Sequence, residues 1–102
     1  MRVTTISAEL YKGSQSLTLT EVVSLLINSK KHKLRVTIKS DSYRQQCYAR
    51  VDRWTGSTWN KVHHVLDMKT KEGLSHKRPT PGADSFEADR RELLRVAERV
   101  LA

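Results

Sequence analysis

The sequence predicts an α+β fold: an antiparallel meander of three strands, or four if residues 2–10 join it, with two helices packed on one face. Three strand-like segments follow one another along the chain, at residues 33–40, 45–54 and 59–67. The connections between them are hairpin-length and rich in turn residues. Apolar residues recur at helical spacing on either side of this block, which predicts the two helices.

Residues 2–10 are expected to form the additional strand. Ile6, Ala8 and Leu10 alternate with polar side chains, and a period of two is typical of a strand with one buried face. A short helix that ends at Gly13 is the alternative interpretation of this segment.

The next segment is expected to form the first helix, over about residues 19–29. Thr18 and Glu21 match a capping box, in which both side chains bond to free amides of the first helical turn. An apolar stripe at helical spacing follows, formed by Leu19, Val22, Val23 and Leu26. The basic run at 30–33 would then lie at the negative pole of the helix dipole.

The register of the three central strands can be tested by pairing Trp54 with Trp59 across the second turn. Both hairpins then agree on one core face, consisting of Leu34, Val36, Ile38, Cys47, Ala49, Val51, Val62 and Leu66, with His64 as its polar member. The pairs predicted across the strands include Val36 with Ala49, Ala49 with His64, and Asp52 with both Lys33 and Lys61.

Residues 67–84 lack periodicity and are expected to be a flexible basic loop within a single domain, 1–102. The last helix is predicted over about residues 85–101. Asp84 and Glu87 resemble a cap at its start, and one helix face would hold Phe86, Leu93, Ala97 and Val100, with Leu94 and Leu101 beside it.

The positive charge is concentrated in the middle of the chain. Lys and Arg outnumber Asp and Glu by 19 to 11, and the whole excess lies between residues 28 and 80. A localised basic field attracts nucleic acids or acidic protein surfaces. Solubility without a specific ligand is the alternative explanation of the charge.

Enzymatic, metal and membrane functions are not expected. Cys47 and His64 are the nearest approach to a nucleophilic pair, but their place on the core face favours a buried thiol beside a hydrogen-bonded histidine. His63 and His64 are adjacent on a strand and would point to opposite faces, so they predict no metal site. With no apolar segment near the length of a membrane span, we expect a cytoplasmic protein without a cofactor.

The outer face of the predicted sheet is the best candidate for a binding surface, because aromatic and basic residues alternate on it. The candidate residues are Lys33, Arg35, Tyr48, Arg50, Trp54, Trp59, Lys61 and His63, together with Lys69, Lys71, Lys77 and Arg78 of the loop. They favour a non-enzymatic nucleic-acid-binding module, with single strands as the suited ligand. The alternative is a small interaction or inhibitor protein, of a phage or mobile-element type, that docks on an acidic host protein. In a third interpretation the two tryptophans only clamp the hairpin.

The predicted order of helix, three-stranded meander and helix resembles a double-stranded RNA-binding domain. Such domains present basic residues at the start of the last helix, where this chain has Asp84, Glu87 and Asp89. The resemblance is therefore limited to element order, and it assigns no site residue.

Overall fold

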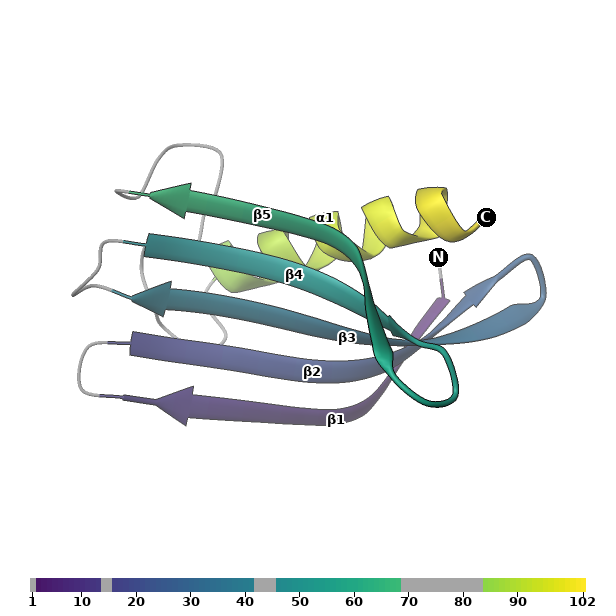
Figure 1. Ribbon diagram of the computed structural model, residues 1–102, viewed down its shortest axis with the longest axis horizontal. Coiled ribbons are helices and arrows are strands. Elements are labelled where there is room, and N and C mark those ends of the chain that lie inside the picture. The colour runs from purple at the N-terminus through teal and green to yellow at the C-terminus, as the bar shows by residue number, and fades with distance from the viewer. Residues whose placement is uncertain (1, 14–15, 42–45, 69–83) are drawn as a thin grey trace.

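In the part of the chain that the structure describes, five antiparallel strands form one sheet, and a helix packs across one of its faces (Figure 1). The computed structural model describes residues 2–13, 16–41, 46–68 and 84–102. The elements are β1 (Arg2–Lys12), β2 (Ser16–Ile27), β3 (Lys30–Asp41), β4 (Gln46–Trp54), β5 (Trp59–Met68) and α1 (Asp84–Leu101). Every strand pairs with its neighbours in the chain, so the sheet is a meander of order β1-β2-β3-β4-β5.

The predicted fold class is wrong, because the segment expected to be the first helix is strand β2. Its burial alternates: Leu17, Val23, Leu25 and Ile27 are buried, whereas Val22 and Leu26 lie on the other face and are half-buried. The apolar residues therefore satisfy a period of two as well as the helical period. Pairing on both sides with β1 and β3 decides between the two, because tertiary contacts outweigh local propensity.

A tight turn at Asn28 and Ser29 explains why this segment continues as a hairpin. Their φ angles are +51° and +65°, as in the type I′ turns that join two antiparallel strands. Ile27 and Lys30 pair directly across the turn. The helix-first element order is therefore not adopted, and with it the resemblance to double-stranded RNA-binding domains ends.

The basic run at 30–33 is thus part of β3 and divides between the two faces of the sheet. Lys31 and Lys33 are exposed, whereas His32 is buried. Burial, assisted by the charges of Arg53 and Lys30, lowers the pKa of His32. This histidine is therefore neutral at pH 7.

Residues 2–10 do form a strand, as predicted, and β1 is an edge of the sheet. A β-bulge interrupts its pairing with β2 between Thr5 and Ser7. Ile6, beside the bulge, is 56% exposed, and Tyr11 is 69% exposed. The helix packs against β2, β3, β4 and β5.

The three later strands were predicted in the right places but not in the right register. In the first hairpin Val36 pairs with Val51 rather than Ala49, and Ile38 pairs with Ala49, which is a shift of two residues. A shift of two keeps every side chain on its face. Val36, Ile38, Ala49 and Val51 are accordingly all buried.

A second β-bulge changes the other hairpin. Trp54 pairs with Trp59 and Asp52 with Lys61, as predicted, but Val51 then pairs with His63 and leaves Val62 as the extra residue. Beyond the bulge the faces of β5 are exchanged relative to the prediction. His64 pairs with Arg50 on the outer side, and His63 belongs to the row of Val51.

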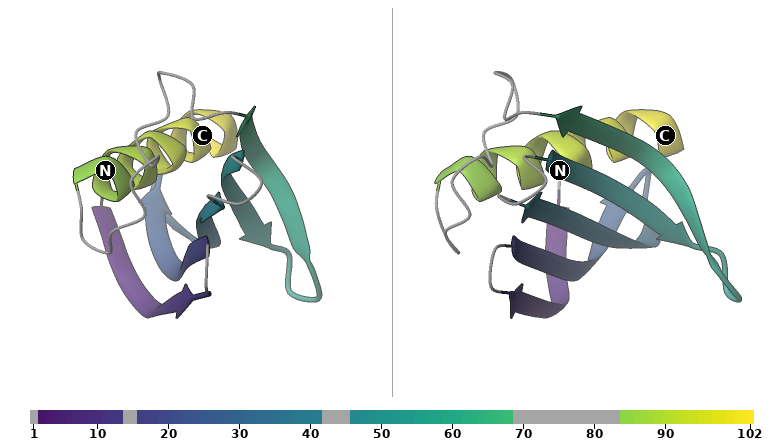
Figure 2. Two further views of the ribbon diagram at one scale, coloured as in Figure 1. Left: turned by 90° about the vertical axis from the view of Figure 1, so that its left-hand side faces the viewer. Right: turned by 60° about the vertical axis from the view of Figure 1, so that its left-hand side comes forward.

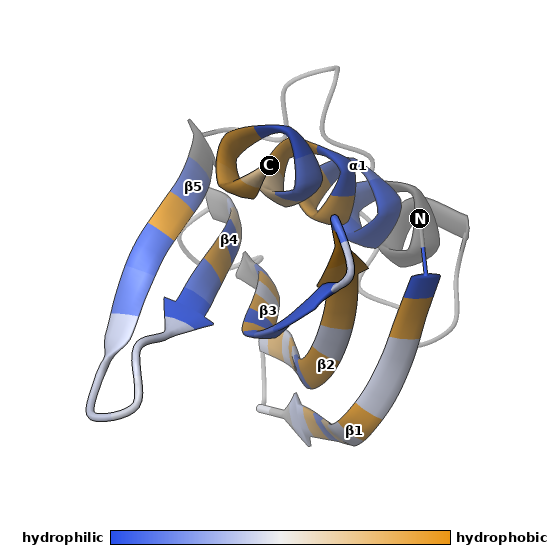
Figure 3. Ribbon diagram, turned by 90° about the vertical axis from the view of Figure 1, so that its right-hand side faces the viewer, coloured by the Kyte–Doolittle hydropathy of each residue, from blue (hydrophilic) through white to orange (hydrophobic). Residues whose placement is uncertain are grey.

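The core lies between the sheet and α1. The sheet curves into a trough, and the helix lies across its open side (Figure 2). Leu93, Leu94 and Ala97 of the helix are buried against Leu25, Val36 and other apolar residues of β2, β3 and β4. Bands of hydrophobic and hydrophilic residues alternate along β1 and β2 (Figure 3). The helix agrees with its predicted range, but Val100, expected on its core face, is exposed.

An ion pair joins the helix to the sheet inside this core. Arg90 donates from Nε to Glu21 Oε1 at 2.5 Å and from Nη2 to Oε2 at 3.2 Å, and the Thr5 hydroxyl donates to Oε2 at 2.7 Å. Burial alone would raise the pKa of Glu21, but these hydrogen bonds and the charge of Arg90 lower it overall. The carboxylate that suggested a helix cap thus anchors α1 across the sheet.

Replacing Ile38 by Ala should destabilise the protein by about 2–5 kcal/mol, because it leaves a cavity beneath the helix. Chemical denaturation followed by tryptophan fluorescence measures the change. Lys39→Ala, at the neighbouring exposed position, is the control and should change the free energy of unfolding by less than about 0.5 kcal/mol. Equal effects of the two substitutions would contradict the assignment of faces.

Glu21→Gln should lower stability most at neutral pH. Because the pKa of Glu21 is lower in the folded state than its ordinary value of 4.5, the ionised carboxylate adds stability above that pH. This contribution is lost as the pH falls from 4.5 through the folded-state value. The difference between the wild-type protein and the variant should therefore shrink in acid, as measured by urea denaturation across pH 3–7. A constant difference would count against the ion pair.

Candidate functional site

The outer face is the side of the sheet that faces away from α1. The register assigns side chains to it from three neighbouring strands: Lys33, Arg35 and Lys39 of β3, Tyr48, Arg50, Asp52 and Trp54 of β4, and Trp59, Lys61 and His64 of β5. The lysines and His64 are exposed, and the aromatic and arginine side chains are half-buried. Seven of the predicted site residues thus share this surface: Lys33, Arg35, Tyr48, Arg50, Trp54, Trp59 and Lys61.

Asp52 is the centre of this surface and is only 1% exposed. Arg50 donates from Nε to its Oδ1 at 2.7 Å, and Arg35 donates from Nη2 to its Oδ2 at 3.4 Å. The predicted pairing of Asp52 with Lys33 is therefore wrong, although Lys61 is its neighbour across the strands. Two arginines cover a carboxylate that the outer face would otherwise expose.

Hydrogen bonds to Tyr48 and Asp52 raise the pKa of Arg50. Both bonds favour the charged form, since each holds the guanidinium against an acceptor. Arg50 is consequently positively charged at every physiological pH. Its side chain is about one-third exposed, so this charge is accessible at the surface.

The two tryptophans form the predicted pair at the end of the β4–β5 hairpin. Their ring centroids are 5.2 Å apart, at an interplanar angle of 56°. The Arg35 guanidinium lies 4.6 Å from the ring centre of Trp59, and Lys33 Nζ lies 5.7 Å from that of Trp54. Each ring therefore holds a cation in place by a cation–π contact.

The second bulge places His64 on this surface in the position expected for His63. The ring of His64 lies against that of Tyr48, with centroids 4.9 Å apart and an interplanar angle of 55°. The sequence does not reveal that His64 takes the position expected for His63, because both residues are histidine. His63 does not join the site.

The candidate nucleophilic pair is not brought together. Cys47 pairs with Ser40 and Asp67 on the neighbouring strands, whereas His64 pairs with Arg50 and contacts Tyr48 on the outer face. Among the residues that the structure describes, no group of three or more His, Cys, Asp or Glu side chains could hold a metal ion. In the same part of the chain, no helix is long and apolar enough to cross a membrane.

The four predicted loop residues, Lys69, Lys71, Lys77 and Arg78, lie outside the described residues. Sequence reasoning in turn missed the part of the outer face that β1 and β2 contribute. Arg2 and Lys31 flank Leu26 there, in one row across three strands. The Asn28–Ser29 pair, which turns β2 back into β3, was the sequence signal that could have revealed this row.

Asp52→Asn should lower the free energy of unfolding by about 1–3 kcal/mol, because two half-buried arginines lose their counter-charge. Glu92→Gln is the matched control, since Glu92 pairs with Arg95 at 2.8 Å on the exposed side of the helix. That pair should contribute less than about 0.5 kcal/mol. Thermal or urea denaturation measures both, and an unchanged stability of the Asp52 variant would show that the arginines do not depend on it.

Comparison of the chain with protein-family models, with curated proteins and with solved structures finds no match. The function is therefore inferred from the chain's own residues, above all from the charges and rings of the outer face.

Proposed function

We propose that this protein is a non-enzymatic nucleic-acid-binding module that holds a single strand against the outer face of its sheet. The observation that carries the proposal is the balance of charge on β3, β4 and β5. These strands contribute six lysine and arginine side chains to the outer face: Lys31, Lys33, Arg35, Lys39, Arg50 and Lys61. Asp52 is the single carboxylate among the described side chains of this surface, and two arginines already neutralise it.

The spacing of these cations suits a chain of phosphates. Side chains on one face recur about every 6.7 Å along a strand, and neighbouring strands lie about 4.8 Å apart. Lys33, Lys39 and Lys61 are exposed, and no ion pair with a described residue occupies them. Neutralising phosphates at such positions releases counterions, which favours binding at low salt.

The aromatic rings favour a single strand over a duplex. Tyr48, Trp54 and Trp59 are half-buried, so each presents part of a ring at the surface among the cations. Unpaired bases can stack on such rings, whereas the bases of a duplex are already stacked on one another. The contacts of Lys33 and Arg35 with the tryptophans hold these cations beside the rings.

An acidic protein surface is the second candidate ligand, and the packing of the tryptophans favours it. One side of each ring already contacts a cation of this chain, which reduces the surface left for a base. A rigid cluster of tryptophan, tyrosine and arginine is also typical of protein–protein hot spots. Salt dependence and ligand preference distinguish the two candidates.

The test is fluorescence anisotropy with labelled single-stranded and duplex oligonucleotides across a salt series. The variant with Lys33, Lys39 and Lys61 all changed to Gln should bind single strands more weakly. Its log–log salt slope should be smaller by roughly 2, since each lost phosphate contact removes about 0.7. The matched control changes three exposed helix residues, Arg91, Arg95 and Arg99, to Gln and removes the same charge from the opposite side of the molecule.

Equal losses in the two triple variants would mean that net charge, and not the outer face, determines binding. Failure to bind any oligonucleotide at about 100 µM in low salt would overturn the proposal, because even non-specific binding usually reaches that range. A saturable complex with an acidic protein, weakened by the outer-face variant alone, would then favour the second candidate.

A further inference from the structure

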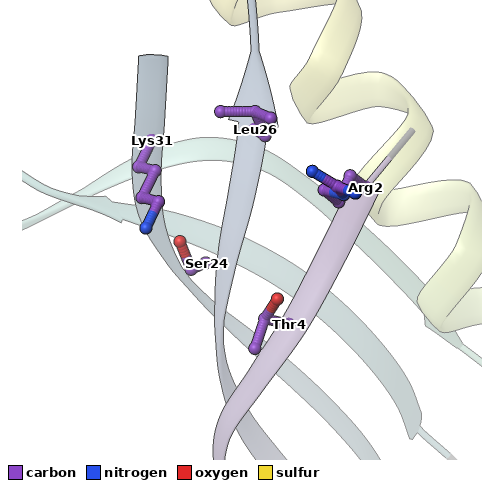
Figure 4. Close-up of a pocket in the computed structure, with 5 residues that line it drawn as sticks. All are labelled: Arg2, Thr4, Ser24, Leu26 and Lys31. Atoms are coloured by element: carbon purple, nitrogen blue, oxygen red, sulfur yellow. The ribbon is translucent and has the colours of Figure 1, made fainter. Parts of the chain in front are cut away.

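A pocket of about 240 Å³ opens on the outer face where β1, β2 and β3 run side by side (Figure 4). It is lined by Arg2, Thr4, Ser24, Leu26 and Lys31. Ser24 and Leu26 of the central strand are half-buried, and the residues from the two flanking strands are exposed. The pocket is thus a basin with a floor on β2 and walls on β1 and β3.

The strand register accounts for this arrangement. Arg2, Leu26 and Lys31 form one row across the three strands, and Thr4 and Ser24 belong to the next row on the same face. The strands that carry Arg2 and Lys31 are separated by β2, so their backbones lie about 10 Å apart. Two long cationic side chains can close on a small group between them.

The lining matches a doubly charged oxyanion. It contains two cations, two hydroxyl groups that can donate hydrogen bonds, and no carboxylate. A phosphate monoester carries a charge of about −1.5 to −2 at neutral pH, whereas each internal phosphate of a nucleic acid carries only one negative charge. The volume is below the roughly 300–1,000 Å³ of pockets for drug-sized ligands, which fits a single phosphate group.

We propose that this pocket binds a phosphate monoester, held between Arg2 and Lys31 with the hydroxyls of Thr4 and Ser24 as further donors. The identity of the ligand as the terminal phosphate of a nucleic-acid strand rests on the proposed function. Lys33 continues the same face beyond Lys31, toward Trp54. A strand whose end lies in the pocket can therefore continue across the cations of the outer face.

The pocket is tested with small probes by amide NMR of the untagged protein. Thymidine 5′-monophosphate and inorganic phosphate should shift the amide signals of Thr4, Ser24 and Lys31, whereas thymidine should not. The double variant Arg2→Gln/Lys31→Gln should lose these shifts. Arg91→Gln/Arg99→Gln removes the same charge from the helix and should keep them. The spectra also report whether each variant is folded.

The source of the phosphate is tested with oligonucleotides that differ only at the 5′ or 3′ end. A terminal phosphate should raise the affinity of the oligonucleotide for the wild-type protein about tenfold, which is the equivalent of one charge-assisted hydrogen bond. In the Arg2/Lys31 variant, the affinities with and without the terminal phosphate should be about equal. If thymidine monophosphate binds but the terminal phosphate has no effect, the pocket stands and the strand end is excluded as its ligand.

Two outcomes separate this proposal from the proposed function. Thymidine monophosphate binding to a protein that binds no oligonucleotide would overturn the nucleic-acid function and leave the pocket as a site for a small phosphate ester. Oligonucleotide binding without any shift of the pocket amides by thymidine monophosphate or phosphate would overturn the pocket and leave the outer face as the binding surface.

Discussion

One side of the curved sheet is buried beneath α1, and the positions of the core and of the candidate site follow from this burial. Leu25, Val36 and their neighbours become a core only because α1 covers them. The Glu21–Arg90 ion pair holds the helix against the sheet at one point. Elsewhere along the helix, apolar packing of Leu93 and Ala97 holds it in place. The described side chains on the opposite face of β3, β4 and β5 are polar, charged or aromatic, so the candidate site is a consequence of how the core is closed.

The sequence predicted four of the five strands and the last helix, but not β2. Residues 17–27 satisfy both periods, and the chance match of Thr18 and Glu21 to a helix cap favoured the wrong one. What decides the matter is long-range: β2 has a partner on each side, and Glu21 meets a helix residue 69 positions away. Such partners cannot be read from a local window. Asn28 and Ser29 were the one local signal for a hairpin, through their left-handed turn.

The composition of the candidate surface was easier to predict than its internal contacts. Side chains alternate along a strand, so a register error of two residues leaves Arg35, Tyr48 and Arg50 on the same face. The predicted faces of the first hairpin are therefore correct although its predicted register is not. Contacts depend on the exact register, so Lys33 was wrongly predicted as a partner of Asp52, and Arg35 takes its place. The bulge in β5 exchanges the faces of His63 and His64. Because both residues are histidine, the pattern of residue types along the strand does not reveal the exchange.

The bulge in β1 has a consequence for the behaviour of the protein at high concentration. A straight edge strand offers its free backbone groups to any other edge, and that is a common route to aggregation. Here the irregularity between Thr5 and Ser7 breaks the regular spacing of those groups in the middle of the strand, beside the exposed side chain of Ile6. An eleven-residue edge is thereby divided into two shorter segments, and the bend at the bulge makes the strand a poorer template for an intermolecular sheet.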